Sequence, residues 1–194
     1  MSFDLRAYRE ALGCFPTGVA IITTLGADGS PLGLTCNSFS SVSLEPPLVL
    51  FSLRKASSLL DAFRAGPSFA INILSQEQDA LSARFASSRI SHKFDGVAWR
   101  PGGRGLPLID DCLASFECDN HASHEAGDHI IFIGEVRHMA SGPAGQALVF
   151  YKGAYRNLTE SGRARDAPGT TDVLDTLITT LRAGENPRCG RGQA

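Results

Sequence analysis

Apolar residues recur along this chain at two different spacings. Near the amino terminus, Leu5, Tyr8, Leu12 and Phe15 stand three or four positions apart, which places them on one face of a helix over 4–15. Farther along, short runs rich in β-branched and aromatic residues are bounded by glycine, proline and serine, which is typical of strands. We expect strands over 19–24, 32–38, 48–53, 68–74, 113–118, 129–139 and 146–151.

Two short helices interrupt the predicted strands. One covers 57–65, with Ser57 as its cap, and the other begins at Ser75, which forms a capping-box signature with Gln78. Thr17-Gly18 and the glycine-rich segment 100–106 are expected to be turns or loops. Many short strands with few helices predict a mainly β fold, an antiparallel barrel or sandwich with peripheral helices.

The composition changes after Leu158. We expect a polar linker over 159–170, an amphipathic helix over 171–182 and a disordered tail, which leaves 1–158 as one domain. The apolar stripe of that helix could pack on its own barrel, across a dimer or over a ligand entrance.

Charge and cysteine content exclude several function classes. The formal net charge is −2 with no basic stripe, so we expect no nucleic-acid partner. The five cysteines are odd in number and include no CxxC pair, which argues against a disulfide framework or a thiolate zinc site. No signal-peptide core and no apolar run of about 20 residues occurs, so we expect a cytoplasmic protein without a membrane span.

Two polar segments are candidates for a ligand site. Seven small polar residues crowd 34–43, which reads either as an edge strand entering a serine-rich turn or as a wall of hydrogen-bonding groups for a polar ring system. Arg54 and Lys55 precede a helix start at Ser57, which reads either as solvated charge or as a phosphate site. No glycine-rich dinucleotide motif and no phosphate-binding loop motif occurs in the chain.

Three further features extend this set. Arg84-Phe85-Ala86 followed by Lys93 could put aromatic surface and a cation beside a flat anionic ligand. His129 opens a strongly apolar strand, where a lone histidine is more often structural than functional. His121 and His124 lie just before it, but their spacing matches no compact metal motif and the segment is expected to span a turn, so we expect no metal.

Several of these segments occur together in one order and spacing, at 15–20, 33–39, 43–48, 69–74, 84–86, 93–94, 127–129 and 151–155. In this respect the chain resembles the flavin reductase domain family, whose members are FMN-binding split barrels that include the small reductase components of two-component flavin-dependent monooxygenases. The resemblance implies an antiparallel split β-barrel with peripheral helices. It also implies hydride transfer from NADH or NADPH to FMN or FAD, a homodimer, and a separate monooxygenase that receives reduced flavin.

The resemblance also implies roles for individual residues. His129 would lie near the nicotinamide and act in hydride transfer, and Tyr151 would lie close to the site. The flavin would contact Thr35, Cys36, Asn37, Ser38, Ser52, Arg54, Ser57, Phe85, Ala86 and Lys93. Two positions depart from the family pattern. Cys36 stands where alanine or serine is common, and Ile130 stands where threonine is common. Two alternatives stay open: a flavin-binding electron carrier without enzyme activity, and a split barrel that binds haem or another ligand.

Overall fold

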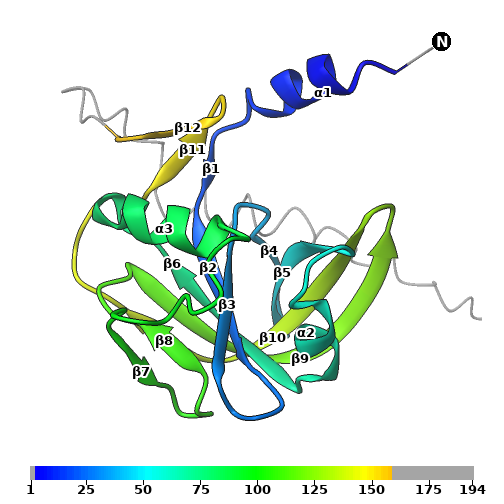
Figure 1. Ribbon diagram of the computed structural model, residues 1–194. Coiled ribbons are helices and arrows are strands. Elements are labelled where there is room, and N and C mark those ends of the chain that lie inside the picture. Colours follow the sequence, from blue (N-terminus) through cyan, green and yellow to red (C-terminus); the bar gives the residue numbers. More distant parts are fainter. Residues whose placement is uncertain (1–2, 159–194) are drawn as a thin grey trace, which may run out of the picture. The chain divides into compact units, whose positions relative to one another are not determined.

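The computed structural model describes residues 3–158, which form a mainly antiparallel β structure (Figure 1). The helices are α1 (Leu5–Leu12), α2 (Leu60–Ala65), the 3-10 turn η1 (Gln76–Gln78) and α3 (Asp79–Ala86). The strands are β1 (Thr17–Gly18), β2 (Ala20–Leu25), β3 (Pro31–Cys36), β4 (Ser40–Leu44), β5 (Pro47–Arg54), β6 (Ser68–Ile73), β7 (Trp99–Pro101), β8 (Pro107–Ile109), β9 (Ala114–Ala126), β10 (His129–Ser141), β11 (Val149–Tyr151) and β12 (Ala154–Arg156). No helix within 3–158 is long and apolar enough to cross a bilayer.

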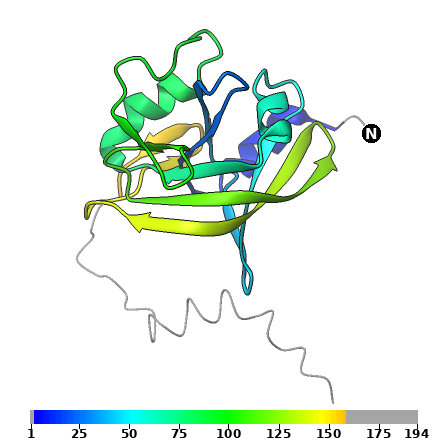
Figure 2. The ribbon, with the colours of Figure 1, turned by 90° about the horizontal axis from the view of Figure 1, so that it is seen from below.

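Seven strands form one antiparallel sheet in the order β3-β2-β6-β9-β10-β5-β4. Smaller sheets join β1, β11 and β12, and join β7 and β8. Figures 1 and 2 show the large sheet curling around an interior, with the long pair β9 and β10 forming one wall. The mainly β, antiparallel fold class predicted from the strand pattern is confirmed.

Aromatic side chains fill the interior of the curled sheet. The ring of Phe51 lies 5.0 Å from that of Phe69 and 5.2 Å from that of Phe132. Phe63 of α2 joins them at 5.5 Å from Phe51, and all four side chains are buried. Because α2 inserts an aromatic ring into this core, the segment that precedes it is fixed against the end of β5.

Helix α3 packs on the outer face of the sheet. Its Phe85 is fully buried in a second apolar cluster with Val19, Ile21 and Leu74. A Cβ atom at Gly33 would lie 2.8 Å from the Phe85 ring, so the absence of a side chain there lets α3 approach β3 closely. The capping box predicted from Ser75 and Gln78 is present at the start of η1.

Several sequence predictions need correction. Thr17–Gly18 is a short strand instead of a turn, because it pairs with β11. Residues 40–44 form strand β4 against β5, where a serine-rich turn was expected. Strand β9 continues to Ala126 instead of ending at Cys118, because polar residues can occupy its outer positions while it pairs with β10. His121 and His124 therefore lie on a strand and not in a turn.

The prediction of a loop over the glycine-rich segment 100–106 was only partly right. Its first residues belong to β7, and a tight turn then leads to β8. In that turn the backbone N–H groups of Gly103 and Arg104 each donate to the carboxylate of buried Glu117 at 3.0 Å. The turn thus supplies hydrogen-bond donors to the carboxylate of Glu117, which β9 places in the interior. The predicted linker and helix after 158 lie outside the described residues.

Candidate functional site

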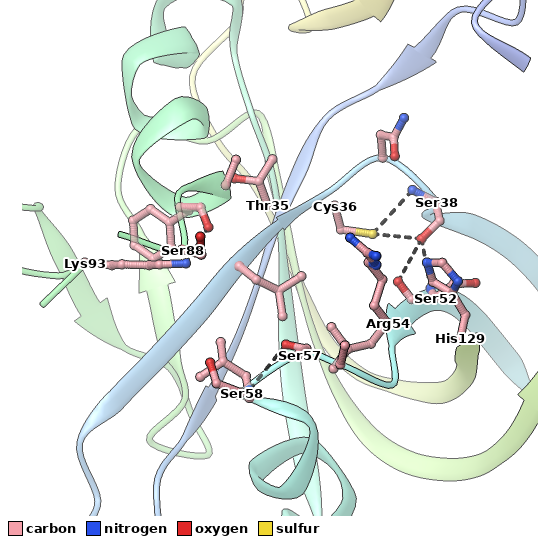
Figure 3. Close-up of a pocket in the computed structure, with 17 residues that line it drawn as sticks. Thr35, Cys36, Ser38, Ser52, Arg54, Ser57, Ser58, Ser88, Lys93 and His129 are labelled. Atoms are coloured by element: carbon pink, nitrogen blue, oxygen red, sulfur yellow. Dashed lines mark hydrogen bonds between the residues drawn. The ribbon is translucent and has the colours of Figure 1, made fainter. Parts of the chain in front are cut away.

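A cavity of about 740 Å³ opens along the outer edge of β3 (Figure 3). Segments far apart in sequence form its walls: β3 with the residues after it, the end of β5 and the approach to α2, the end of α3 with the loop after it, and the start of β10. The lining residues are Leu34, Thr35, Cys36, Asn37, Ser38, Ser52, Leu53, Arg54, Ala56, Ser57, Ser58, Leu59, Phe85, Ala86, Ser88, Lys93 and His129.

The cavity exists because β3 is an edge strand. Among the strands of residues 3–158, β3 pairs only with β2, so its other edge presents backbone N–H and C=O groups to the cavity. A ligand with several donors and acceptors along one side can pair with such an edge as a strand would. This geometry suits a flat heterocycle better than a purely apolar ligand.

One end of the cavity, the strand end, is formed by Cys36, Ser38, Ser52 and His129. The backbone N–H of Ser52 donates to the Ser38 hydroxyl at 2.8 Å, and that hydroxyl donates to the Ser52 carbonyl at 3.3 Å. The Cys36 sulfur lies 2.9 Å from the same hydroxyl oxygen. Burial raises the pKa of the Cys36 thiol, so it remains protonated and can donate to Ser38. These bonds tie the segment that follows β3 to β5.

The opposite end, the loop end, is formed by Ser57, Ser58, Ser88 and Lys93. The Lys93 ammonium donates to the Phe85 carbonyl at 2.6 Å, at the carboxyl end of α3. Partial burial lowers the pKa of Lys93. The ammonium is thus held at the cavity wall by the last turn of the helix.

Arg84 fixes the loop that carries Lys93. Its guanidinium donates to the backbone carbonyls of His92 at 3.1 Å, Lys93 at 2.7 Å and Asp95 at 2.7 Å. The Arg84 charge is therefore used inside the protein, and the cation that this segment places at the cavity is Lys93. Phe85 does line the cavity, but its ring is fully buried and packs edge-on against Phe94 at 5.0 Å.

The approach to α2 also differs from its prediction. The helix begins at Leu60, and its cap position, Leu59, makes no side-chain bond. Ser57 instead accepts a hydrogen bond from the Leu59 N–H at 3.3 Å in the preceding turn. Arg54 is exposed at the end of β5 and lines the cavity, whereas Lys55 pairs with Glu125 at 2.9 Å and is absent from the lining.

His129 lies opposite Arg54 in the register of β10 and β5, at the strand end of the cavity (Figure 3). Its Nδ1 is 2.8 Å from an Asp128 carboxylate oxygen, and this hydrogen bond lowers the pKa of Asp128. The carboxylate therefore sets the orientation of the ring and leaves Nε2 for a ligand. Within residues 3–158 no group of three or more acidic, histidine or cysteine side chains is placed to hold a metal ion.

Of the residues predicted for the site, Tyr151 is the one that the structure does not bring to the cavity. It lies on β11, with Lys152 5.4 Å above its ring. Tyr155, the second residue of β12, contacts α3 behind the cavity wall. Its hydroxyl lies 2.8 Å from that of Ser82, whose carbonyl accepts from Thr35 at 2.6 Å.

Sequence reasoning missed six lining residues. They are the apolar or small neighbours of predicted ones and a serine of the α3–β7 loop: Leu34, Leu53, Ala56, Ser58, Leu59 and Ser88. The adjacent serine pairs at 57–58 and 87–88 were the available signal, since small hydroxyl residues recur at both sides of the loop end.

Comparison with known proteins identifies the family. The family model described as "Flavin reductase like domain" matches residues 12–159. The chain belongs to this family. The antiparallel split barrel expected for such a flavin reductase agrees with the fold of solved relatives. The NADH:FAD oxidoreductase SgcE6 of Streptomyces globisporus, solved with NAD and FAD fragments, superimposes with a TM-score of 0.78 at 38% identity, over 82% of this chain and 96% of that one.

Two relatives in sequence have reductase names. The flavin reductase described here is 48% identical over 150 residues to "FMN reductase (NADH) SmoA" of Agrobacterium fabrum, covering 77% of this chain and 84% of that protein. It is 40% identical over 181 residues to "Flavin-dependent monooxygenase, reductase subunit HsaB" of Mycobacterium tuberculosis, covering 92% and 95%.

Proposed function

We propose that this protein is an NADH:flavin oxidoreductase that supplies reduced flavin to a separate monooxygenase. The observation that carries the proposal is the cavity along the free edge of β3, whose lining contains every residue that the family resemblance puts in contact with the flavin. Tyr151, expected close to the site, lies outside this lining. The names of SmoA, HsaB and SgcE6 support the same reaction. They favour neither an electron carrier without enzyme activity nor a haem protein.

The residues present fit a flavin. The edge of β3 and the Ser38 region offer donors and acceptors to a ring system, and the loop end offers the hydroxyls of Ser57 and Ser58 and the ammonium of Lys93 to a phosphate. Arg54 adds a second cation at the wall. This polarity orients the ligand, with its ring toward the strand end and its phosphate toward the loop end.

A bound flavin would supply the redox chemistry, accepting hydride at N5 from the nicotinamide C4 of NADH. The protein supplies position. His129, oriented by Asp128, directs Nε2 into the strand end, where it can bind the amide or a phosphate of the nucleotide donor. The Ser38 hydroxyl and the backbone of Ser52 fix the same end of the cavity, so the donor and the ring can meet there in one geometry.

NADH is the preferred donor in this proposal, as the names of SmoA and SgcE6 suggest. A reducing compartment, the cytoplasm, fits the free thiols of Cys14, Cys36, Cys112 and Cys118.

We further propose a homodimer. Helix α1 buries none of its residues, and its apolar face is left open, with Leu5 62%, Leu12 56% and the following Phe15 76% exposed. An apolar face of this kind is typical of a contact between subunits. Light scattering should give twice the chain mass of 20.6 kDa; the mass of a single chain would contradict the dimer.

The function is tested by an anaerobic absorbance scan of the purified protein with FMN, before and after addition of NADH or NADPH. We expect catalytic bleaching of the flavin band with NADH and slower bleaching with NADPH. Bound flavin that stays oxidised would support the electron-carrier alternative, and a Soret band in the purified protein would support haem binding. Absence of flavin binding would contradict the family-based function.

A further inference from the structure

The small sheet of β1, β11 and β12 lies beside α3 (Figure 1). The residues that line the flavin cavity all come from other elements. The small sheet nevertheless touches the cavity wall at two points. The Asn37 side-chain amide donates to the Thr17 hydroxyl of β1 at 3.4 Å, and the Tyr155 hydroxyl of β12 lies 2.8 Å from the Ser82 hydroxyl of α3. The second of these contacts leads to Thr35 in the cavity.

The Thr35 side chain presents only a hydrogen-bond acceptor to the cavity. Leu34 and Cys36 of β3 pack in the core of the curled sheet, so the side chain between them points to the other face, toward α3. The Thr35 hydroxyl donates to the Ser82 carbonyl at 2.6 Å. Because a carbonyl can only accept, the one hydrogen of this hydroxyl is engaged and its oxygen lone pairs remain for a ligand. A ligand group that bonds to Thr35 must therefore be a donor, which a flavin supplies at its ring N3–H and its ribityl hydroxyls.

Ser82 joins β3 to β12 through α3. This residue is fully buried, and it bonds to Thr35 through its carbonyl and to Tyr155 through its hydroxyl. Tyr155 is itself fixed by its strand pairing with Phe150 of β11 and by an edge-on contact between the two rings at 5.8 Å. Because a buried hydroxyl without a partner is costly, the bond between Ser82 and Tyr155 holds α3 at a set distance from β12. The position of the Thr35 oxygen thus depends on Tyr155.

We infer that Tyr155 is a positioning residue for flavin binding, which acts through Ser82 on the acceptor that Thr35 presents. The inference rests on the proposed function, because the ligand that Thr35 meets is the flavin. Tyr155 itself lies outside the cavity lining, and its hydroxyl fixes the wall from behind. Loss of that hydroxyl should therefore weaken flavin binding. The reduction of bound flavin depends on His129 at the strand end and should change little.

The first measurement is the Kd of FMN for Tyr155→Phe, obtained by titrating the flavin-free protein and following flavin fluorescence. The substitution keeps the ring that packs on Phe150 and removes only the hydroxyl. We expect the Kd to rise about fivefold, as for the loss of one hydrogen bond, and the reduction rate at saturating FMN and NADH to stay within about twofold. Tyr8→Phe is the matched control, because Tyr8 is exposed on α1 and lies outside the cavity; it should change neither quantity. An unchanged Kd for Tyr155→Phe would overturn the inference.

The second measurement separates action through Thr35 from general support of α3. Thr35→Val keeps the shape of the side chain but removes the hydroxyl, so that Tyr155→Phe has no acceptor left to displace. In the Thr35→Val protein, Tyr155→Phe should therefore raise the Kd of FMN less than about twofold. If the full effect persists in that background, Tyr155 supports α3 without positioning Thr35, and the inference fails.

A third variant, Ser82→Ala, breaks the same link from the other side. Alanine favours a helix more than serine does, so weaker flavin binding in this variant cannot come from a weaker helix. The Kd of FMN should again rise about fivefold, and Tyr155→Phe should add less than about twofold to it, because both substitutions remove one bond. Urea denaturation checks that each variant is folded. Binding of FMN by Ser82→Ala as tight as by the unchanged protein would overturn the inference.

Failure of this inference differs from failure of the proposed function. If the unchanged protein binds and reduces FMN while the Tyr155→Phe and Ser82→Ala variants match it, the positioning role is rejected and the function stands. If the unchanged protein neither binds nor reduces flavin, the function is contradicted, and the inference fails with it.

Discussion

The two ends of the flavin cavity are built in different ways. At the strand end, Ser38, in the link between β3 and β4, bonds directly to the backbone of Ser52 on β5, so this wall is tied to a strand of the large sheet. At the loop end, the wall is an irregular segment whose backbone carbonyls converge on one side chain, Arg84. A strand is held by many backbone bonds, whereas in this loop three backbone carbonyls are held by the single guanidinium of Arg84. Changes at the strand end should therefore alter reaction geometry, and changes at the loop end should alter affinity.

The largest effect is expected from His129→Ala. Loss of the imidazole leaves the nucleotide donor misaligned, so flavin reduction should slow by about a hundredfold in stopped-flow measurements. Flavin affinity should change little, because the β3 edge and the loop end remain. His124→Ala is the matched control, since His124 lies on the neighbouring strand and outside the cavity. An unchanged reduction rate would remove His129 from the mechanism.

Next in size is Arg84→Ala. The substitution removes charge-assisted bonds to three carbonyls, at a cost of about 2 kcal/mol or more, so the loop with Lys93 should loosen and the Kd of FMN should rise about thirtyfold. Arg84→Lys should not restore binding, because an ammonium lacks the planar fork that spans these carbonyls. Arg89→Ala removes the same charge from the exposed part of the loop and should leave FMN binding intact. Equal effects of the two alanine variants would contradict a positioning role for Arg84.

A smaller effect is expected from Ser38→Ala. The Ser52 N–H loses its acceptor, which should lower the free energy of unfolding by about 1–2 kcal/mol in urea denaturation. The reduction rate should fall more than flavin affinity does, in contrast to Arg84→Ala. Ser40→Ala, at an exposed position just beyond the cavity, should leave both quantities unchanged.

The smallest effect concerns the reactivity of Cys36. Because burial raises the pKa of this thiol, its thiolate is scarce at pH 8, and peptide mapping after iodoacetamide treatment should find Cys14 modified well before Cys36. The neutral thiol is favoured in the folded state, so this contribution to stability is present below the ordinary thiol pKa of about 8.5 and decreases as pH rises above it. Rapid modification of Cys36 at pH 8 in the folded protein would contradict the burial of its thiol in the cavity wall.

The regular parts of the fold were predictable because apolar periodicity reports burial directly. The runs that became β2, β3, β5, β6 and β10 are apolar enough to be recognised alone. Residues 119–126 are not, since their side chains are polar and largely exposed, and they are held as strand by pairing with β10. Pairing of that kind is a tertiary effect that no local pattern encodes.

The site was predictable for a different reason. Local motifs identified the residues around 35–38 and 52–57, and the family resemblance joined them. What motifs could not give is which way each side chain faces. Arg84 and Lys55 are cations in the right segments, yet both are engaged elsewhere. Tyr151 and Tyr155 are four residues apart, and only the pairing of β11 with β12 places the second behind the site.

The unpaired edge of β3 has one more consequence. An open edge can accept a strand from another molecule, which is how many β proteins begin to aggregate. A flavin lying along this edge would occupy the same backbone groups, so it would also keep the chain from associating with itself. The protein should accordingly remain in solution longer on storage with flavin than without it.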